Sequence, residues 1–164
     1  MTTDDSVRAI LSTPHDRELR IERVFNASRQ RVWAAMTEPQ LLAQWWGRGN
    51  KLTVECLEVK RGGKWRFVEH ASDGVHGFEG RFREVSPPRR YVRTFEYDGM
   101  PGQVLIETVT LEEIETGRTK VVSVSLFRSR EERDQMIKAG AEEGVQQSYA
   151  ALDRVLGKHV AEVR

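Results

Sequence analysis

Cysteine is almost absent from this sequence, with Cys56 the only one among 164 residues. A single cysteine excludes an intramolecular disulfide and favours a reducing, cytoplasmic compartment. Long apolar runs are also lacking, since no stretch approaches the roughly 18 residues that span a membrane as a helix. The N-terminus carries acidic residues where a secretory signal peptide needs basic ones. We therefore expect a cytoplasmic protein that makes no contact with a membrane.

An excess of one charge sign is lacking too, because 26 basic residues stand against 25 acidic ones. This balance gives no electrostatic reason to expect a nucleic-acid partner. Phosphate-binding loops, HExxH and nucleophile-elbow motifs do not occur in the sequence. His70 and His76 flank Asp73-Gly74, but a two-residue turn there pairs Ala71 with His76 and sends the two histidines to opposite faces. We expect no metal and no cofactor, and a homodimer stays open without a motif that requires one.

The order of predicted elements indicates one domain over residues 16–164, after a flexible leader over residues 1–15. The run ELRIERVF alternates as a strand does. Ser28 can cap a first short helix, and PQLLAQWWG predicts a second one that ends at Gly47. Strand-like runs separated by turn signals then fill the chain from about Lys51 to Phe127, which is typical of an antiparallel meander.

The last element is predicted as one long helix from Ser129 to Leu156. The compact arrangement of these elements is α+β, with a curved antiparallel sheet wrapped around that helix. Gly140, Gly144 and Ser148 are four residues apart and share one helix face, with Met136 before them in the same row. A face this shallow either brings another backbone very close or leaves a hollow against the sheet.

The predicted sheet favours the hollow, because bulky rings on its inner face hold the helix away. By strand phase the inner side chains are Trp65, Phe67, Phe78, Phe82, Phe95 and Tyr97. The dipeptide Trp45-Trp46 is expected to send one ring to the core and the other to the mouth of the hollow. The complete set of predicted ligand-binding residues is Trp33, Trp46, Trp65, Phe67, Phe78, Phe82, Phe95, Tyr97, Met136, Gly140, Gly144 and Ser148.

Two glutamates share the inward phase and are the candidate catalytic residues. Glu69 follows Trp65 and Phe67 in phase, and Glu107 lies between Leu105 and Val109. Glutamate is more common at a sheet rim or on the solvent face, so that placement stays open for both. If either is enclosed, it could act as an acid or base with Tyr97 or Tyr149.

Seven pieces of the sequence, in this order, resemble a known family: RVFNASRQRVWAAMTEPQLLAQWWG, RGGKWRF, DG, GRFREVSPPRR, GRTKV, SRE and GAEEGVQQSYAALDRVL. Together they cover about residues 17–157 and are similar to the SRPBCC superfamily, the START-like helix-grip fold shared with the birch pollen allergen. The branch they resemble is that of the activator of the heat-shock chaperone ATPase. The resemblance implies a seven-stranded sheet that grips the C-terminal helix around a hydrophobic cavity, with two short helices closing one end. Val145 and Tyr149 depart from the family pattern, so no ligand is implied.

We expect a binding protein for a small apolar or aromatic molecule, held between sheet and helix. An enzyme of the cyclase or hydrolase kind that uses the same pocket is the alternative. A chaperone-associated protein that uses its outer surface is a weaker one. No nucleophile and base can be paired from the sequence, which favours binding.

Overall fold

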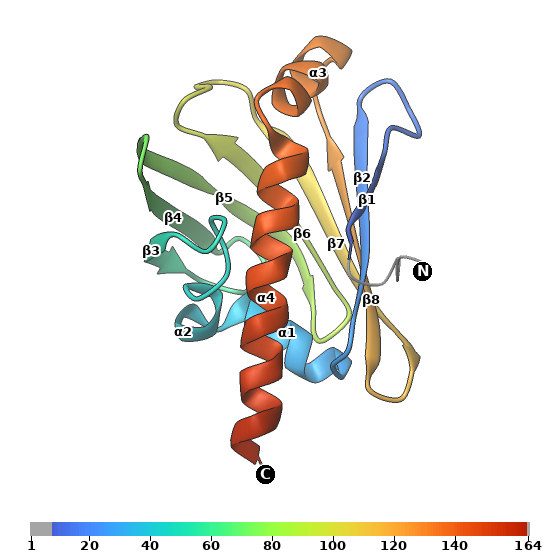
Figure 1. Cartoon of the computed structure of the whole chain (residues 1–164). Helices are drawn as coiled ribbons and strands as arrows, with labels where there is room; N and C mark the ends of the chain where they lie inside the picture. Colours follow the sequence, from blue (N-terminus) through green and yellow to red (C-terminus); the bar gives the residue numbers. More distant parts are fainter. Residues whose placement is uncertain (1–7, 164) are drawn as a thin grey trace, which may run out of the picture.

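One antiparallel sheet of eight strands, in the order β1-β2-β8-β7-β6-β5-β4-β3, curves around a long C-terminal helix (Figure 1). The computed structural model describes residues 8–163, with side chains for residues 8–157. Its strands are β1 (Ile10–Ser12), β2 (Glu18–Phe25), β3 (Lys51–Leu57), β4 (Lys64–Ala71), β5 (Gly74–Ser86), β6 (Arg90–Tyr97), β7 (Leu105–Glu115) and β8 (Arg118–Leu126). Its helices are α1 (Arg29–Thr37), α2 (Pro39–Leu42), α3 (Arg130–Lys138) and α4 (Ala141–Val163). The predicted α+β class and the helix-grip arrangement are confirmed.

The sheet has one strand more than the seven expected. Residues 10–12, within the stretch predicted as a flexible leader, form β1 and pair antiparallel with β2. Leu11 lies opposite Ile21, and Ala9 just before the strand is buried against the sheet. Part of the leader is therefore the edge of the sheet. This three-residue strand is too short to show a period of alternation, so the sequence pattern did not reveal it.

The single C-terminal helix was predicted wrongly. The chain forms two helices, α3 and α4, and turns between them at Gly140, whose φ is +102°. A left-handed φ of this kind is open to glycine and strained for other residues. Gly140 therefore changes the direction of the chain, and α4 continues past Gly157 to Val163. In Figure 1, α3 stands off the end of α4 above the sheet.

The second short helix also ends earlier than predicted, at Leu42. From Ala43 to Asn50 the chain makes turns, and three successive residues, Gly47, Arg48 and Gly49, have positive φ. The first helix begins as expected, with Ser28 Oγ accepting a hydrogen bond from the Arg31 backbone N–H at 3.3 Å.

The β4–β5 hairpin turns one residue earlier than predicted. Ala71 lies opposite Gly74 rather than His76, and His76 lies opposite Glu69. Each residue of β4 therefore pairs with the β5 residue two positions earlier than predicted. A shift of two residues preserves the face of every side chain. His70 and His76 thus lie on opposite faces, as predicted, and His76 shares the inner face with Glu69.

The apolar core lies where the second half of α4 meets α1 and the sheet. Leu152 of α4 is fully buried there, together with Val32 of α1 and Phe25 of β2. Arg23 of β2 ties the helix to the sheet through two hydrogen bonds to Asp153, at 3.1 and 2.5 Å. The first half of α4 faces the same sheet without filling the space before it. No helix in the described part of the chain is long and apolar enough to cross a membrane.

Candidate functional site: a cavity between sheet and helix

A cavity of about 450 Å³ lies between the inner face of the sheet and the corner formed by α3 and α4. Apolar side chains from β2, β5, β6, β7 and α3 make up much of its wall, among them Leu19, Ile21, Phe78, Phe95, Leu105, Val109 and Met136. The glycine row forms the helical side, where Gly140, Gly144 and Ser148 all line the space. Binding pockets for small molecules fall in this size range and have mostly apolar walls.

Gly144 explains why the helix leaves room. A Cβ built on Gly144 would meet only the Arg48 side chain, with Cδ at 3.8 Å and Cγ at 3.9 Å, and no strand backbone within 4 Å. These are ordinary van der Waals distances, so no other backbone packs tightly against the helix at this point. The shallow helix face at Gly144 therefore borders a hollow and not a closely packed backbone.

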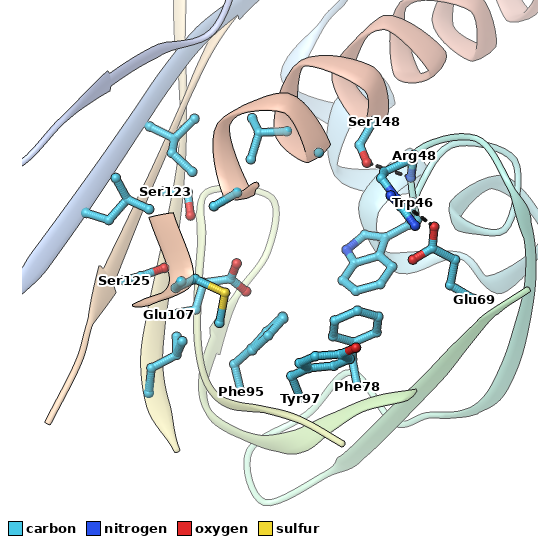
Figure 2. A pocket seen from close by; sticks show the side chains of 18 of the residues that line it. Trp46, Arg48, Glu69, Phe78, Phe95, Tyr97, Glu107, Ser123, Ser125 and Ser148 are labelled. Carbon is cyan, nitrogen blue, oxygen red and sulfur yellow. Dashed lines mark hydrogen bonds and ion pairs between the residues drawn. The ribbon is translucent and has the colours of Figure 1, made fainter. Parts of the chain in front are cut away.

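Four aromatic rings form one wall of the cavity (Figure 2). Trp46 lies edge-on to Phe78 with ring centroids 4.9 Å apart, and Phe78 stacks on Tyr97 at 5.0 Å. Phe95 completes the wall beside them, 5.7 Å from Phe78. Trp45 enters the core and donates from Nε1 to the Ala35 carbonyl at 2.8 Å, and it also lines part of the cavity. The prediction that one ring of Trp45-Trp46 enters the core fits Trp45, but both rings border the cavity.

Four of the predicted ligand-binding rings lie outside the lining: Trp33, Trp65, Phe67 and Phe82. Trp33 is half-buried on α1, whereas the three strand rings have the inward phase, and other side chains lie over Phe67 and Trp65. Trp46 packs against Phe67, with centroids 5.1 Å apart, and the guanidinium of Arg93 lies 4.1 Å above the Trp65 ring. Strand phase gives the face of a side chain and says nothing about what covers it.

A polar cluster that we name the mouth network lies at one end of the cavity: Arg48, Asn50, Glu69 and Ser148. Arg48 Nε donates to Glu69 Oε2 at 2.8 Å, and Asn50 Nδ2 donates to the same oxygen at 2.7 Å. The backbone N–H of Arg48 donates to Ser148 Oγ of α4 at 2.8 Å. The glycines beside Arg48 let the loop turn back so that it reaches both strand and helix.

Next to the mouth network, Tyr97 and His76 face the cavity and contact each other. The Tyr97 hydroxyl lies 2.7 Å from His76 Nδ1, and His76 Nε2 lies 2.9 Å from Asp73 Oδ1. The hydrogen bond from His76 lowers the pKa of Asp73. Burial, followed by the charges of Asp73 and Glu69, raises the pKa of Tyr97.

Deeper in the cavity, three neighbouring strands bring a polar row into the apolar wall. Arg93, Glu107 and Ser125 lie side by side on β6, β7 and β8, and we name them the inner polar row. Arg93 Nε donates to Glu107 Oε1 at 2.7 Å, with side-chain exposures of 3% and 17%. Burial acts to lower the pKa of Arg93, but the charge and hydrogen bond of Glu107, together with the effect of Tyr91, raise the pKa overall. Glu107, Ser123 and Ser125 lie on the side of the cavity away from Glu69 in Figure 2.

Two tyrosines stand beside the inner polar row. Tyr91 precedes Arg93 by two residues on β6 and is buried, and Tyr149 projects from α4 beside Phe25, with ring centroids 5.2 Å apart. Burial raises the pKa of both phenols, and the charge of Glu107 acts on each in the same direction. The candidate catalytic residues Glu69 and Glu107 therefore both line the cavity, and each is held by an arginine.

Sequence reasoning missed Arg48, Tyr91, Arg93 and His76 as lining residues. A signal for two of them was present, because Tyr91 and Arg93 have the same strand phase as Phe95 and Tyr97. A buried arginine is rare, which is why that phase was not extended to Arg93. Arg48 could not be found in this way, since it reaches the cavity from an irregular loop.

The chain matches the family described as "Activator of Hsp90 ATPase homolog 1-like protein" over residues 26–157. The chain belongs to this family. The sheet that grips α4 also places it in the SRPBCC helix-grip superfamily, as the resemblance implied. No curated protein matches the sequence.

Solved structures of three bacterial proteins are similar to this chain over most of its length. A crystal structure from Rhodobacter sphaeroides has 27% identity and a TM-score of 0.83, and the match covers 92% of this chain and 99% of that one. A solution structure from Arthrobacter aurescens has 26% identity and a TM-score of 0.81, with 91% of each chain covered. Protein CV1439 from Chromobacterium violaceum has 27% identity and a TM-score of 0.72, with 85% of this chain and 96% of that chain covered.

Proposed function

We propose that this protein binds a small, largely apolar molecule in the cavity between the sheet and α4. The observation that carries the proposal is an apolar space of about 450 Å³ that the first half of α4 leaves unfilled at Gly144. Interiors of proteins are otherwise close-packed, so a space of this size beside the core is large enough for a small molecule. An apolar ligand that enters it leaves water for an apolar wall, which is favourable.

Binding is favoured over catalysis by the state of the two candidate carboxylates. Glu69 is paired with Arg48 and accepts a further hydrogen bond from Asn50. Glu107 is paired with Arg93. In each carboxylate one oxygen is bound by an arginine, whose charge neutralises it, and the other oxygen can still accept a hydrogen bond from a ligand. Their arrangement suits orientation of a ligand better than proton transfer.

A neutral fluorescent dye, N-phenylnaphthylamine, tests the proposal in a titration of the purified protein. We expect saturable binding at one site and a fluorescence increase, because the dye leaves water for an apolar wall. The variant Gly144→Leu should weaken binding by filling the space. Gly157→Leu makes the same change on the same helix at a position with nothing within 4 Å of an added Cβ, and it should bind the dye as the parent does.

Native mass spectrometry of the freshly purified protein provides an independent check for a retained small molecule. The proposal fails if the dye does not saturate, or if Gly144→Leu binds it as tightly as Gly157→Leu. In either case the cavity would not be the binding site.

A further inference from the structure

Several polar groups on the deep wall of the cavity lack hydrogen-bond partners within the described chain. Arg93 uses only Nε, toward Glu107, so both of its terminal nitrogens are unengaged. The same holds for the hydroxyls of Tyr91 and Ser123, whose side chains are buried, and of half-buried Tyr149. Among the described residues, the enclosed side-chain atoms without a partner are Nε of Arg23, Arg29 and Arg31, so the polar atoms of this wall are not among them. They belong to residues that line the cavity, where they can hydrogen-bond to water or to a polar atom of a ligand.

Each of the two arginines that line the cavity is paired with a glutamate, so their charges cancel. Arg93 and Glu107 form a pair 2.7 Å apart, and Arg48 and Glu69 form a second pair at the mouth network. Asp73 also lines the space, but its side chain is 65% exposed, so solvent screens its charge. An anionic ligand would therefore find each arginine already neutralised by a glutamate. A cationic ligand in the deep end would lie against the Arg93 guanidinium.

The free atoms of the inner polar row fit a hydroxyl group. The terminal nitrogens of Arg93 can donate to a ligand oxygen, and Oε2 of Glu107 has no partner in the described residues and can accept a ligand O–H. The hydroxyl of Ser125, across from Glu107 on β8, can do either. The rings of Phe95 and Phe78, tilted by 52° to each other, then offer apolar surface toward the mouth network.

We propose that the cavity selects a neutral ring compound bearing a hydroxyl group, which the inner polar row binds, and that it rejects carboxylates of the same size. This inference rests on the proposed function and narrows its ligand class. Discrimination arises because a hydroxyl satisfies both Arg93 and Glu107, whereas a carboxylate competes with Glu107 for Arg93 and must give up its hydration.

Four probes of similar shape test the selection by competition against N-phenylnaphthylamine at pH 7: 2-naphthol, naphthalene, 2-naphthoate and 2-naphthylmethylammonium. We expect 2-naphthol to bind about tenfold more tightly than naphthalene, as one hydrogen bond to a charged group provides. Naphthoate and the ammonium compound should bind at least about tenfold more weakly than 2-naphthol, since each brings an unpaired charge out of water.

The variant Glu107→Gln tests the mechanism of rejection. The glutamine keeps an oxygen that can accept a hydrogen bond from Arg93 Nε, but it carries no charge to neutralise the arginine. The affinity for naphthoate should therefore rise about tenfold or more relative to that for 2-naphthol. Glu112→Gln is the matched control, because it makes the same change on the same strand at an exposed position. Should Glu107→Gln fail to fold, Ser125→Ala replaces it, with an expected loss of about fivefold for 2-naphthol and none for naphthalene.

The outcomes separate this inference from the proposal on which it rests. Dye binding with equal affinities for 2-naphthol and naphthalene, or with tighter binding of either charged probe, overturns the inference and leaves the binding function standing. A shift in Glu107→Gln no larger than that in Glu112→Gln overturns the role of Glu107. Failure of the dye itself to bind overturns the binding function.

Discussion

Arg48 spans the cavity edge to reach Glu69, with its Nε 2.8 Å from the carboxylate Oε2. Its aliphatic stem passes the bare face of Gly144, and its backbone N–H is held by Ser148. One loop residue therefore joins the sheet to α4 where no side chain of the helix does so. The glycine row is compatible with a stable fold because this bridge covers part of it.

The first prediction concerns this bridge. Arg48→Met keeps the stem but removes the charge, which leaves buried Glu69 with Asn50 as its remaining side-chain partner. We expect a loss of about 1–2 kcal/mol in unfolding free energy, less than for a fully buried pair because Arg48 is 35% exposed. Chemical denaturation measures it. Arg61→Met, in an exposed turn, is the control, and equal stabilities of the two variants would contradict the bridging role.

Gly144→Leu should raise stability while it lowers dye binding. The new side chain enters open space, so it gains about 1.5–3 kcal/mol from burial and about 1 kcal/mol of helix propensity, less whatever displacement of Arg48 costs. A thermal melt of the variant against the parent measures the sign. If Tm falls instead, the site is overpacked and the region before Gly144 is not a hollow.

Gly140→Ala should have the opposite effect on stability. The φ of +102° at Gly140 strains any residue with a Cβ, even though nothing lies within 4 Å of that atom. We expect a loss of about 1–2 kcal/mol in unfolding free energy, measured by denaturant titration. Gly157→Ala, in regular helix and equally uncrowded, should be neutral or stabilising. A stabilised Gly140→Ala protein would mean that α3 and α4 can straighten into one helix.

These two glycines show where the sequence was informative and where it was not. Their spacing predicted that both face the sheet, and both line the cavity, but helical periodicity is the reason only for Gly144, which lies in α4. The spacing could not show that Gly140 has left-handed φ, since glycine occurs in a helix as well as at its end. Gly140 is thus a turn, and Gly144 alone is a helical residue whose missing side chain leaves space.

The polar side of the cavity was harder to predict than the aromatic side. Alternation in β6 placed Phe95 and Tyr97 inward and gives Tyr91 and Arg93 the same face. What makes Arg93 tolerable there is Glu107 on the neighbouring strand and Trp65 beneath it. Such compensation comes from strand neighbours distant in sequence, which only the folded sheet brings together.

The last prediction uses the tyrosines, since the chain has three and all of them line the cavity. Burial raises the pKa of Tyr91, Tyr149 and Tyr97, the last with added effects of Asp73 and Glu69. A pKa raised by folding contributes stability below the unfolded value of about 10, and that stability is lost as pH rises through the folded values. In the native protein tyrosinate absorbance should therefore appear at higher pH than in the unfolded chain, and ionisation of Tyr91 and Tyr149 should coincide with unfolding followed by circular dichroism. In denaturant all three should titrate near pH 10, which serves as the control.

Tyr97→Phe should remove the earliest part of the native titration, because Tyr97 is the least buried of the cavity phenols. Reversible ionisation of all three phenols near pH 10 in the folded parent would contradict this enclosure of the tyrosines.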